Sequence, residues 1–129
     1  MPMPRIARIS VGVAAGIVAW FVVATVGDWL LRLAIAGYAE VEASMHFTLP
    51  MQVGRLCVGA ASSIAAGATC AWLVPRTRRA VTALAIILVL LFLPVHYRLW
   101  SQFPAWYHAT FLILLAPLVF LGARLSRRA

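Results

Sequence analysis

Long apolar stretches alternate with short polar ones along the whole chain. Four stretches have roughly the 20 mostly apolar residues that a helix needs to cross a bilayer. They cover about residues 9–26, 53–74, 80–97 and 105–123. The polar segments after the second and third stretches are short, so these neighbouring helices are expected to pack antiparallel. The pattern predicts an all-α membrane protein, with a single four-helix transmembrane bundle over residues 1–129.

The composition agrees with this prediction. The chain is 64% hydrophobic and 11% charged, with a mean hydropathy of +0.97. A soluble domain is about 45–50% apolar and about 25% charged, and a soluble fold of this size could not bury so much apolar surface. The abundance of Ala, Arg, Val and Gly, with no Lys, favours a bacterial source. We therefore expect a multi-pass protein of the bacterial inner, or cytoplasmic, membrane.

Arginine placement predicts the orientation. Eight of the eleven arginines lie at the N-terminus, in the PRTRR segment at 75–79 and at the C-terminus. Cytoplasmic loops are enriched in Arg and Lys, so both termini and this segment are expected in the cytoplasm. The other side has three arginines and all three carboxylates. Topology thus accounts for the net charge of +8, and no nucleic-acid partner is needed to explain it.

Small residues predict where the helices approach closely. The first span contains Gly12-x-x-x-Gly16, and the second has Gly59, Ser63 and Gly67 at steps of four. Such residues allow helix backbones to pack together in lipid. We expect them to face each other within the bundle, although a seam between two copies is the alternative. The third and fourth spans are richer in large apolar residues and are expected to be more exposed to lipid.

The first loop is the only long one, and we expect it to be structured. The helical pattern continues past the first span through residues 28–38. Asp28 and Arg32 are four residues apart, a spacing at which opposite charges form an ion pair on a helix. Pro50 is expected to end the loop before the second span.

Most groups that could do chemistry gather on the expected outer side. No titratable group lies deep in the cytoplasmic half of a span, which argues against a proton pump or an ion-coupled transporter. Arg55 falls just inside the second span, where a charge is costly unless it is paired. We expect an acidic partner that fastens the loop to the bundle; the alternative is an arginine that binds an anion or substrate. The candidate outer cluster consists of Asp28, Arg32, Glu40, Glu42, His46, Arg55, His96, Arg98 and His108.

The three histidines allow more than one interpretation. His46, His96 and His108, with a glutamate, could hold zinc, copper or iron, because imidazole and carboxylate suit these metals. However, the chain has no HxxxH, HExxH or CxxC spacing. Haem between His96 and His108 would need both rings to point inward at the same depth. The simpler interpretation is that the histidines bond to neighbouring groups near the membrane surface.

Aromatic residues surround these histidines in the last hairpin, PVHYRLWSQFPAWYH at 94–108. Trp and Tyr collect where lipid headgroups meet hydrocarbon, so a belt at the interface explains Tyr97, Trp100, Trp106 and Tyr107, with Trp29 and Tyr38 from the first outer segment. The alternative is a pocket for a flat apolar ligand, such as a quinone, that enters from the bilayer.

These observations leave the activity open. The chain has no catalytic motif, so our leading hypothesis is a non-enzymatic membrane protein that assembles with itself or serves as an accessory subunit of a larger complex. The alternative is a ligand-, metal- or quinone-binding protein or enzyme with a site on the outer, periplasmic side. A third hypothesis is a small exporter made of two copies.

Overall fold

A computed structural model describes residues 3–75 and 78–128 of the chain, and all its regular elements are helices. Four of the helices are long and apolar enough to cross a membrane. This confirms the all-helical class and the prediction of four helices of spanning length and hydropathy, and each predicted range lies within or closely overlaps one long helix. The elements are α1 (Arg5–Ala34), α2 (Tyr38–Val41), α3 (Leu49–Leu73), α4 (Arg78–Arg98) and α5 (Ala105–Arg128).

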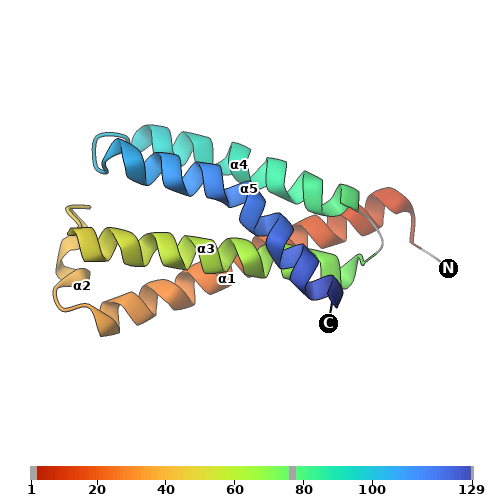
Figure 1. Ribbon diagram of the computed structural model, residues 1–129, viewed down its shortest axis with the longest axis horizontal. Coiled ribbons are helices and arrows are strands. Elements are labelled where there is room, and N and C mark those ends of the chain that lie inside the picture. The colour runs from red at the N-terminus through yellow and green to blue at the C-terminus, as the bar shows by residue number, and fades with distance from the viewer. Residues whose placement is uncertain (1–2, 76–77, 129) are drawn as a thin grey trace.

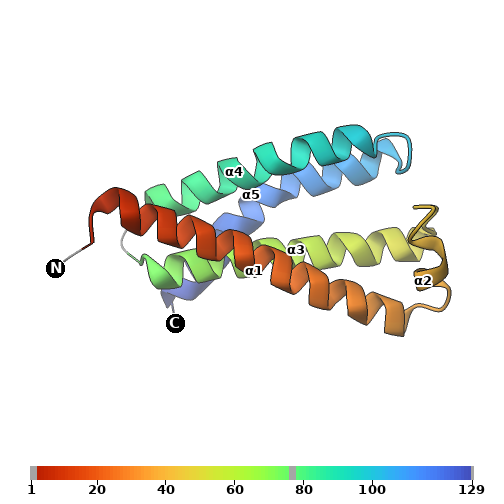
Figure 2. The ribbon, with the colours of Figure 1, turned by 180° about the vertical axis from the view of Figure 1, so that it is seen from behind.

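The four long helices run along the long axis of the molecule (Figures 1 and 2). The start of α1, the end of α3, the start of α4 and the end of α5 lie at one end, which we call the arginine end. The loop containing α2 and the α4–α5 loop lie at the opposite end. We call this second end the acidic end, because Asp28, Glu40 and Glu42 are the only carboxylate side chains of the sequence and all belong to it.

The small residues of α1 and α3 face the interior of the bundle. Gly12, Gly16, Gly59, Ser63 and Gly67 are all buried. A Cβ atom on Gly16 would lie 2.5 Å from Cδ2 of Leu84 and 3.1 Å from the carbonyl oxygen of Ala66. The prediction of close packing within the bundle is confirmed, and the alternative of a seam between two copies is wrong for these residues.

Helices α3 and α5 touch backbone to backbone near the arginine end. A Cβ atom on Gly67 would lie 1.8 Å from the carbonyl oxygen of Val119, and one on Gly122 would lie 1.9 Å from that of Ile64. Pro117 lies inside α5, which bends along its length (Figure 1). Proline removes a backbone hydrogen bond and bends a helix. The bend brings the last part of α5 across α3, at a contact that only glycine allows.

Helix α4 is more buried than its large residues led us to expect. Its apolar window has 39% of its residues buried, the same share as that of α3. Val81, Leu84, Leu88 and Phe92 form its buried face. The expectation that the third span is more exposed to lipid than the second is therefore wrong. The physical reason is that large side chains fill the space between helices that do not approach as closely as α3 and α5.

The loop between α1 and α3 is structured, as predicted. Helix α1 continues to Ala34, and the chain then reverses through Gly37, whose φ of 82° lies in the left-handed region that favours glycine. The loop packs on a second apolar cluster at the acidic end, separate from the main core. This cluster consists of Tyr38, Phe47, Met51, Phe103 and Tyr107, with Leu31 and Ile35 of the first connection packed against it.

Candidate functional site

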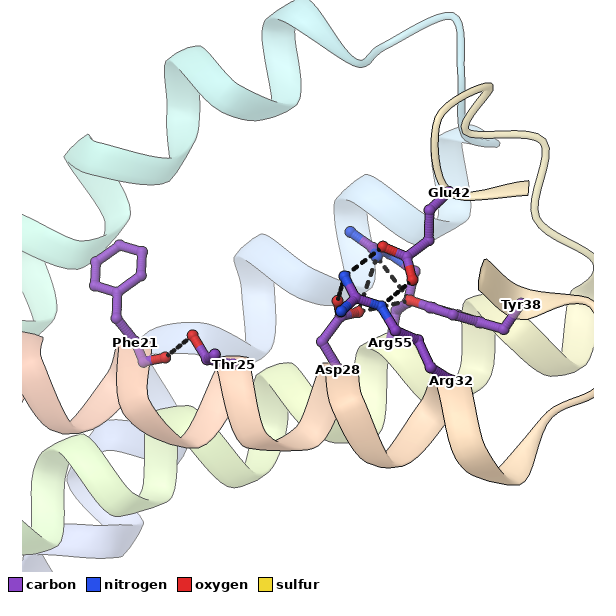
Figure 3. A network of polar contacts seen from close by, with 7 residues as sticks. All are labelled: Phe21, Thr25, Asp28, Arg32, Tyr38, Glu42 and Arg55. Atoms are coloured by element: carbon purple, nitrogen blue, oxygen red, sulfur yellow. Dashed lines mark hydrogen bonds and ion pairs between the residues drawn. The ribbon is translucent and has the colours of Figure 1, made fainter. Parts of the chain in front are cut away.

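A network of charged side chains and one tyrosine joins α1, α2 and α3 at the acidic end (Figure 3). On α1, Nη2 of Arg32 lies 3.1 Å from Oδ2 of Asp28, which confirms the predicted ion pair. The same guanidinium donates to both carboxylate oxygens of Glu42, with 2.8 Å between Nη2 and Oε2. Arg32 therefore ties α1 to the chain that follows α2.

Tyr38 is the centre of the network. Its side chain is fully buried, and its hydroxyl donates to Oδ1 of Asp28 at 2.9 Å while accepting from Nη1 of Arg55 at 2.9 Å. Nη1 of Arg55 is also 3.8 Å from Oδ1 of Asp28. The prediction that Arg55 pairs with an acid is confirmed for Asp28. The tyrosine bridges this pair and brings α2 into contact with α1 and α3.

Arg55 lies between two aromatic rings. Its guanidinium carbon is 4.7 Å from the ring centre of Phe47 and 5.7 Å from that of Phe103, so both rings stabilise the cation. Its Nε atom is buried and has no hydrogen-bond partner among the described residues. Two arginines and two carboxylates cancel within the network, so it has no net charge to attract an anion. This balance favours the fastening role that we expected for Arg55 over an anion-binding role.

The surroundings of the loop residues shift their pKa values. Burial raises the pKa of the Tyr38 hydroxyl to about 12, so the group stays protonated and can donate to Asp28. The hydrogen bonds from Arg32 lower the pKa of Glu42 below its ordinary value of 4.5. Both shifts hold the network in the charge state in which its hydrogen bonds form.

A cavity of about 500 Å³ begins beside this network and extends toward the middle of the bundle. Ligand pockets in proteins have volumes of about 300–1,000 Å³, so its size is suitable for a small molecule. All four long helices contribute to its wall. Its lining includes Asp28, Arg32 and Arg55 of the network, both histidines of the last hairpin, and a group of aromatic rings.

The cavity opens through the side of the bundle, between α1 and α4. Its exposed lining residues come only from these two helices: Phe21, Thr25, Trp29 and Arg32 from α1, and Val95 from α4. The lining residues from α3 and α5 are buried or partly buried. A ligand would therefore enter sideways, from the medium that surrounds the helices.

The cavity becomes less polar with depth. Trp20 and Phe92 are 4.5 Å apart between ring centres, and Phe92 and Phe111 are 5.2 Å apart, which makes an aromatic floor. Nε1 of Trp20 donates to Oγ of Ser63 at 3.1 Å, so the indole is fixed. Trp20 and Asp28 are eight residues apart on α1, which corresponds to roughly 12 Å of helix. The site thus has a polar part at the acidic end and a ring-lined part deeper in the bundle.

Two buried histidines form part of the cavity wall. Nδ1 of His96 on α4 lies 2.7 Å from Nδ1 of His108 on α5, which is a hydrogen-bond distance. The ring of His108 also stacks on Trp100, with 4.8 Å between centres and 14° between planes. Nε2 of His108 lies 3.3 Å from the carbonyl oxygen of Trp100. These contacts join the two helices on either side of the α4–α5 loop.

For neutral rings, the same contacts assign the tautomers. A carbonyl oxygen can only accept, so Nε2 of His108 has the hydrogen and its Nδ1 is an acceptor. Nδ1 of His96 must then donate, which leaves Nε2 of His96 unprotonated. This nitrogen makes no hydrogen bond with any residue that the structure describes. His96, which lines the cavity, therefore has one hydrogen-bond acceptor left for a ligand.

The structure brings together most of the candidate cluster, but not all of it. Asp28, Arg32, Glu42 and Arg55 share one network, and His96 and His108 share the same cavity. Glu40, His46 and Arg98 are exposed and do not line this cavity. Sequence spacing could not separate these two groups, because all nine residues lie near the same end of the bundle.

The metal and haem hypotheses do not fit this geometry. In residues 3–75 and 78–128, no three or more His, Cys, Asp or Glu side chains are placed to hold a metal ion. His46 in particular is exposed and does not join His96 and His108. A haem would have to lie between these two rings, and their 2.7 Å contact leaves no room for its iron.

Several residues of the site were not in the candidate outer cluster. Tyr38 and Tyr107 were expected in the interfacial belt, with a ligand pocket as the alternative, but they are 0% and 5% exposed, so the belt prediction is wrong for them. Trp20 is in the middle of the first span, away from the level where tryptophans usually gather. Its position was the one signal in the sequence that could have indicated a site inside the bundle.

Comparisons with protein-family models, with curated proteins and with solved structures found no match to this chain.

Proposed function

We propose that this protein binds a ring-headed lipid of the quinol class in the cavity between α1 and α4. The observation that supports this most is the unpaired acceptor, Nε2 of His96, beside an aromatic pocket that opens sideways. A quinol has hydroxyl groups that can donate to such a nitrogen, a flat ring and an apolar tail. The hypothesis of a binding protein is thereby favoured over that of an accessory subunit.

The polarity of the cavity suits the way such a lipid lies in a bilayer. Its polar head would lie near Asp28, Arg55 and His96, and its ring and tail would extend toward Trp20 and Phe92. The charge-balanced network favours an uncharged head over an anionic one, because a buried anion would need a cation that is not already paired. The ring floor offers the stacked and edge contacts that aromatic ligands prefer.

We further propose that the acidic end faces the periplasm and that the arginine end faces the cytoplasm, in the inner membrane of a bacterium. The distribution of arginines supports this orientation. The cavity would then open into the outer leaflet. Assembly with itself or with a larger complex, and export by a dimer, remain hypotheses for the same chain.

Oxidised and reduced forms of one ligand test the proposal. A quinol with a short isoprenoid tail, and the quinone made from it, are titrated into the full chain in nanodiscs, with empty nanodiscs as background. The quinone has carbonyl oxygens that only accept, so it cannot donate to Nε2 of His96. We expect the wild-type protein to bind the quinol about tenfold more tightly, the effect of one hydrogen bond of about 1.4 kcal/mol.

A matched pair of variants assigns the effect to His96. In His96→Asn, the amide can still donate to His108, but the acceptor at the position of Nε2 is lost; the preference for the quinol should disappear. His46→Asn makes the same change at an exposed position outside the cavity, and it should behave as the wild type. Binding no greater than that of empty nanodiscs, or a preference that survives in His96→Asn, would refute the proposal.

A further inference from the structure

A second cavity lies at the arginine end, between the beginning of α4 and the end of α5. Its volume is about 680 Å³. Three arginines line it: Arg78 from α4, and Arg124 and Arg127 from α5. The remaining lining residues are Val81, Thr82, Phe120 and Ala123.

The positive-inside rule explains why arginines occur at this end, but not why three of them surround one cavity. On α4 the lining residues have positions 78, 81 and 82, and on α5 they have positions 120, 123, 124 and 127. These are spacings of three and four, which place residues on a single helix face. One face of each helix therefore contributes to a shared site at the end of the bundle.

Arg78 and Arg124 give this site a positive charge. All the Asp and Glu side chains of the sequence belong to the acidic end, so none of them lies beside these two arginines. Arg78 and Arg124 are exposed, and neither makes an ion pair with another residue in the described part of the chain. Guanidinium groups bind phosphate oxygens with two parallel hydrogen bonds, so an arginine cluster suits a phosphate particularly well.

The other wall of the cavity is apolar and lies deeper in the bundle. Val81 and Ala123 are each 1% exposed and close the inner side, while Phe120 is 44% exposed and faces outward. Phe120 is seven residues before Arg127 on α5, which corresponds to about 10 Å of helix. A molecule that fills the site would place a charged group at the helix ends and apolar groups beside the helix surface.

We propose that this cavity binds the phosphate of an anionic glycerophospholipid, with an acyl chain against Phe120. The site is separate from the quinol cavity, and the inference rests on the orientation proposed above but not on quinol binding. Basic pockets between membrane helices on the cytoplasmic side bind anionic headgroups of this kind. A zwitterionic lipid fits less well, because no Asp or Glu side chain lies at this end to pair with its ammonium group.

The experiment measures lipid binding to the full chain in detergent by native mass spectrometry. Short-chain phosphatidylglycerol, phosphatidylethanolamine and inorganic phosphate are titrated separately. We expect saturable binding of one phosphatidylglycerol, with weaker binding of the other two probes. The double variant R78Q/R124Q should weaken phosphatidylglycerol binding by at least about tenfold, because each arginine near an anionic headgroup contributes to affinity.

The control removes the same charge from the same end. Arg5 and Arg8 are exposed on α1 and do not line the cavity, so R5Q/R8Q should leave binding within about twofold of the wild type, a change too small to reflect a lost contact. An equal loss in both double variants would overturn the proposal, since it would mean that binding follows only the net charge. Equal binding of phosphatidylethanolamine would overturn the preference for an anionic lipid, and equal binding of inorganic phosphate would make it a site for a soluble anion.

Discussion

Nδ1 of His96 and Nδ1 of His108 lie 2.7 Å apart in the interior of the bundle. The second nitrogen, Nε2, has different surroundings in the two rings. His108 stacks on Trp100 and bonds to its carbonyl oxygen. His96 lines the cavity, and its second nitrogen has no hydrogen-bond partner among the described residues. The contact therefore has two effects: it joins α4 to α5 near their loop, and it leaves one acceptor of His96 without a protein partner.

A double-mutant cycle should detect this bond. His96→Phe and His108→Phe each leave a buried polar nitrogen without its partner, and we expect each to cost about 1–3 kcal/mol of unfolding free energy. The double variant removes both polar groups, so it should cost less than the sum by about 1 kcal/mol. Unfolding by sodium dodecyl sulfate in mixed micelles provides the measurement. Additive costs would show that the two rings do not interact.

Gly67→Ala should be among the most damaging small substitutions in the chain. The new Cβ atom would lie 1.8 Å from the carbonyl oxygen of Val119, and backbone cannot yield without separating α3 from α5. We expect a loss of about 2–3 kcal/mol or more in the same unfolding assay. Gly54→Ala on the same helix is the control, because its Cβ would meet only the flexible ends of side chains, the nearest being Cδ2 of Leu31 at 2.8 Å. A loss as large in Gly54→Ala would contradict the explanation.

The bond between Arg32 and Glu42 should make stability fall in acid. The pKa of Glu42 is lowered in the folded protein, so its contribution is fully present above its ordinary pKa of 4.5. That contribution disappears as the pH falls through the lower, folded value. Unfolding measured from pH 7 downward should therefore show a smaller acid-induced loss in Glu42→Gln than in the wild type. Glu40→Gln, which removes an exposed carboxylate outside the network, should keep the wild-type profile.

Tyr38 should respond to base instead. Burial raises its pKa from 10.0 to about 12, so its contribution to stability is complete below pH 10 and is lost as the pH rises through 12. A titration followed by phenolate absorbance should show one tyrosine that ionises at a higher pH than the others. The Tyr38→Phe variant should lack this high-pH step. Tyr97→Phe removes an exposed ring and should retain it. Persistence of the high-pH step in Tyr38→Phe would show that another tyrosine is responsible.

The sequence predicted parts of the site for reasons that can be stated residue by residue. Asp28 and Arg32 are neighbours on one helix, so their ion pair follows from spacing alone. Arg55 lies just inside an apolar span, and the cost of an unpaired charge there predicts an acidic partner. The choice of Asp28 over Glu40 could not be predicted, because it depends on how the loop folds back onto the bundle.

The helical class, the four spans and their packing through small residues were determined by the sequence itself. These properties follow from local hydrophobicity and from side-chain size at helical spacing, and both can be read along the chain. Tertiary structure alone decided that Tyr38 bridges two charges, that His96 faces His108 and that Trp20 forms the floor of a cavity. Each of these depends on the distance between side chains on different helices, and local patterns of hydrophobicity and side-chain size do not determine that distance.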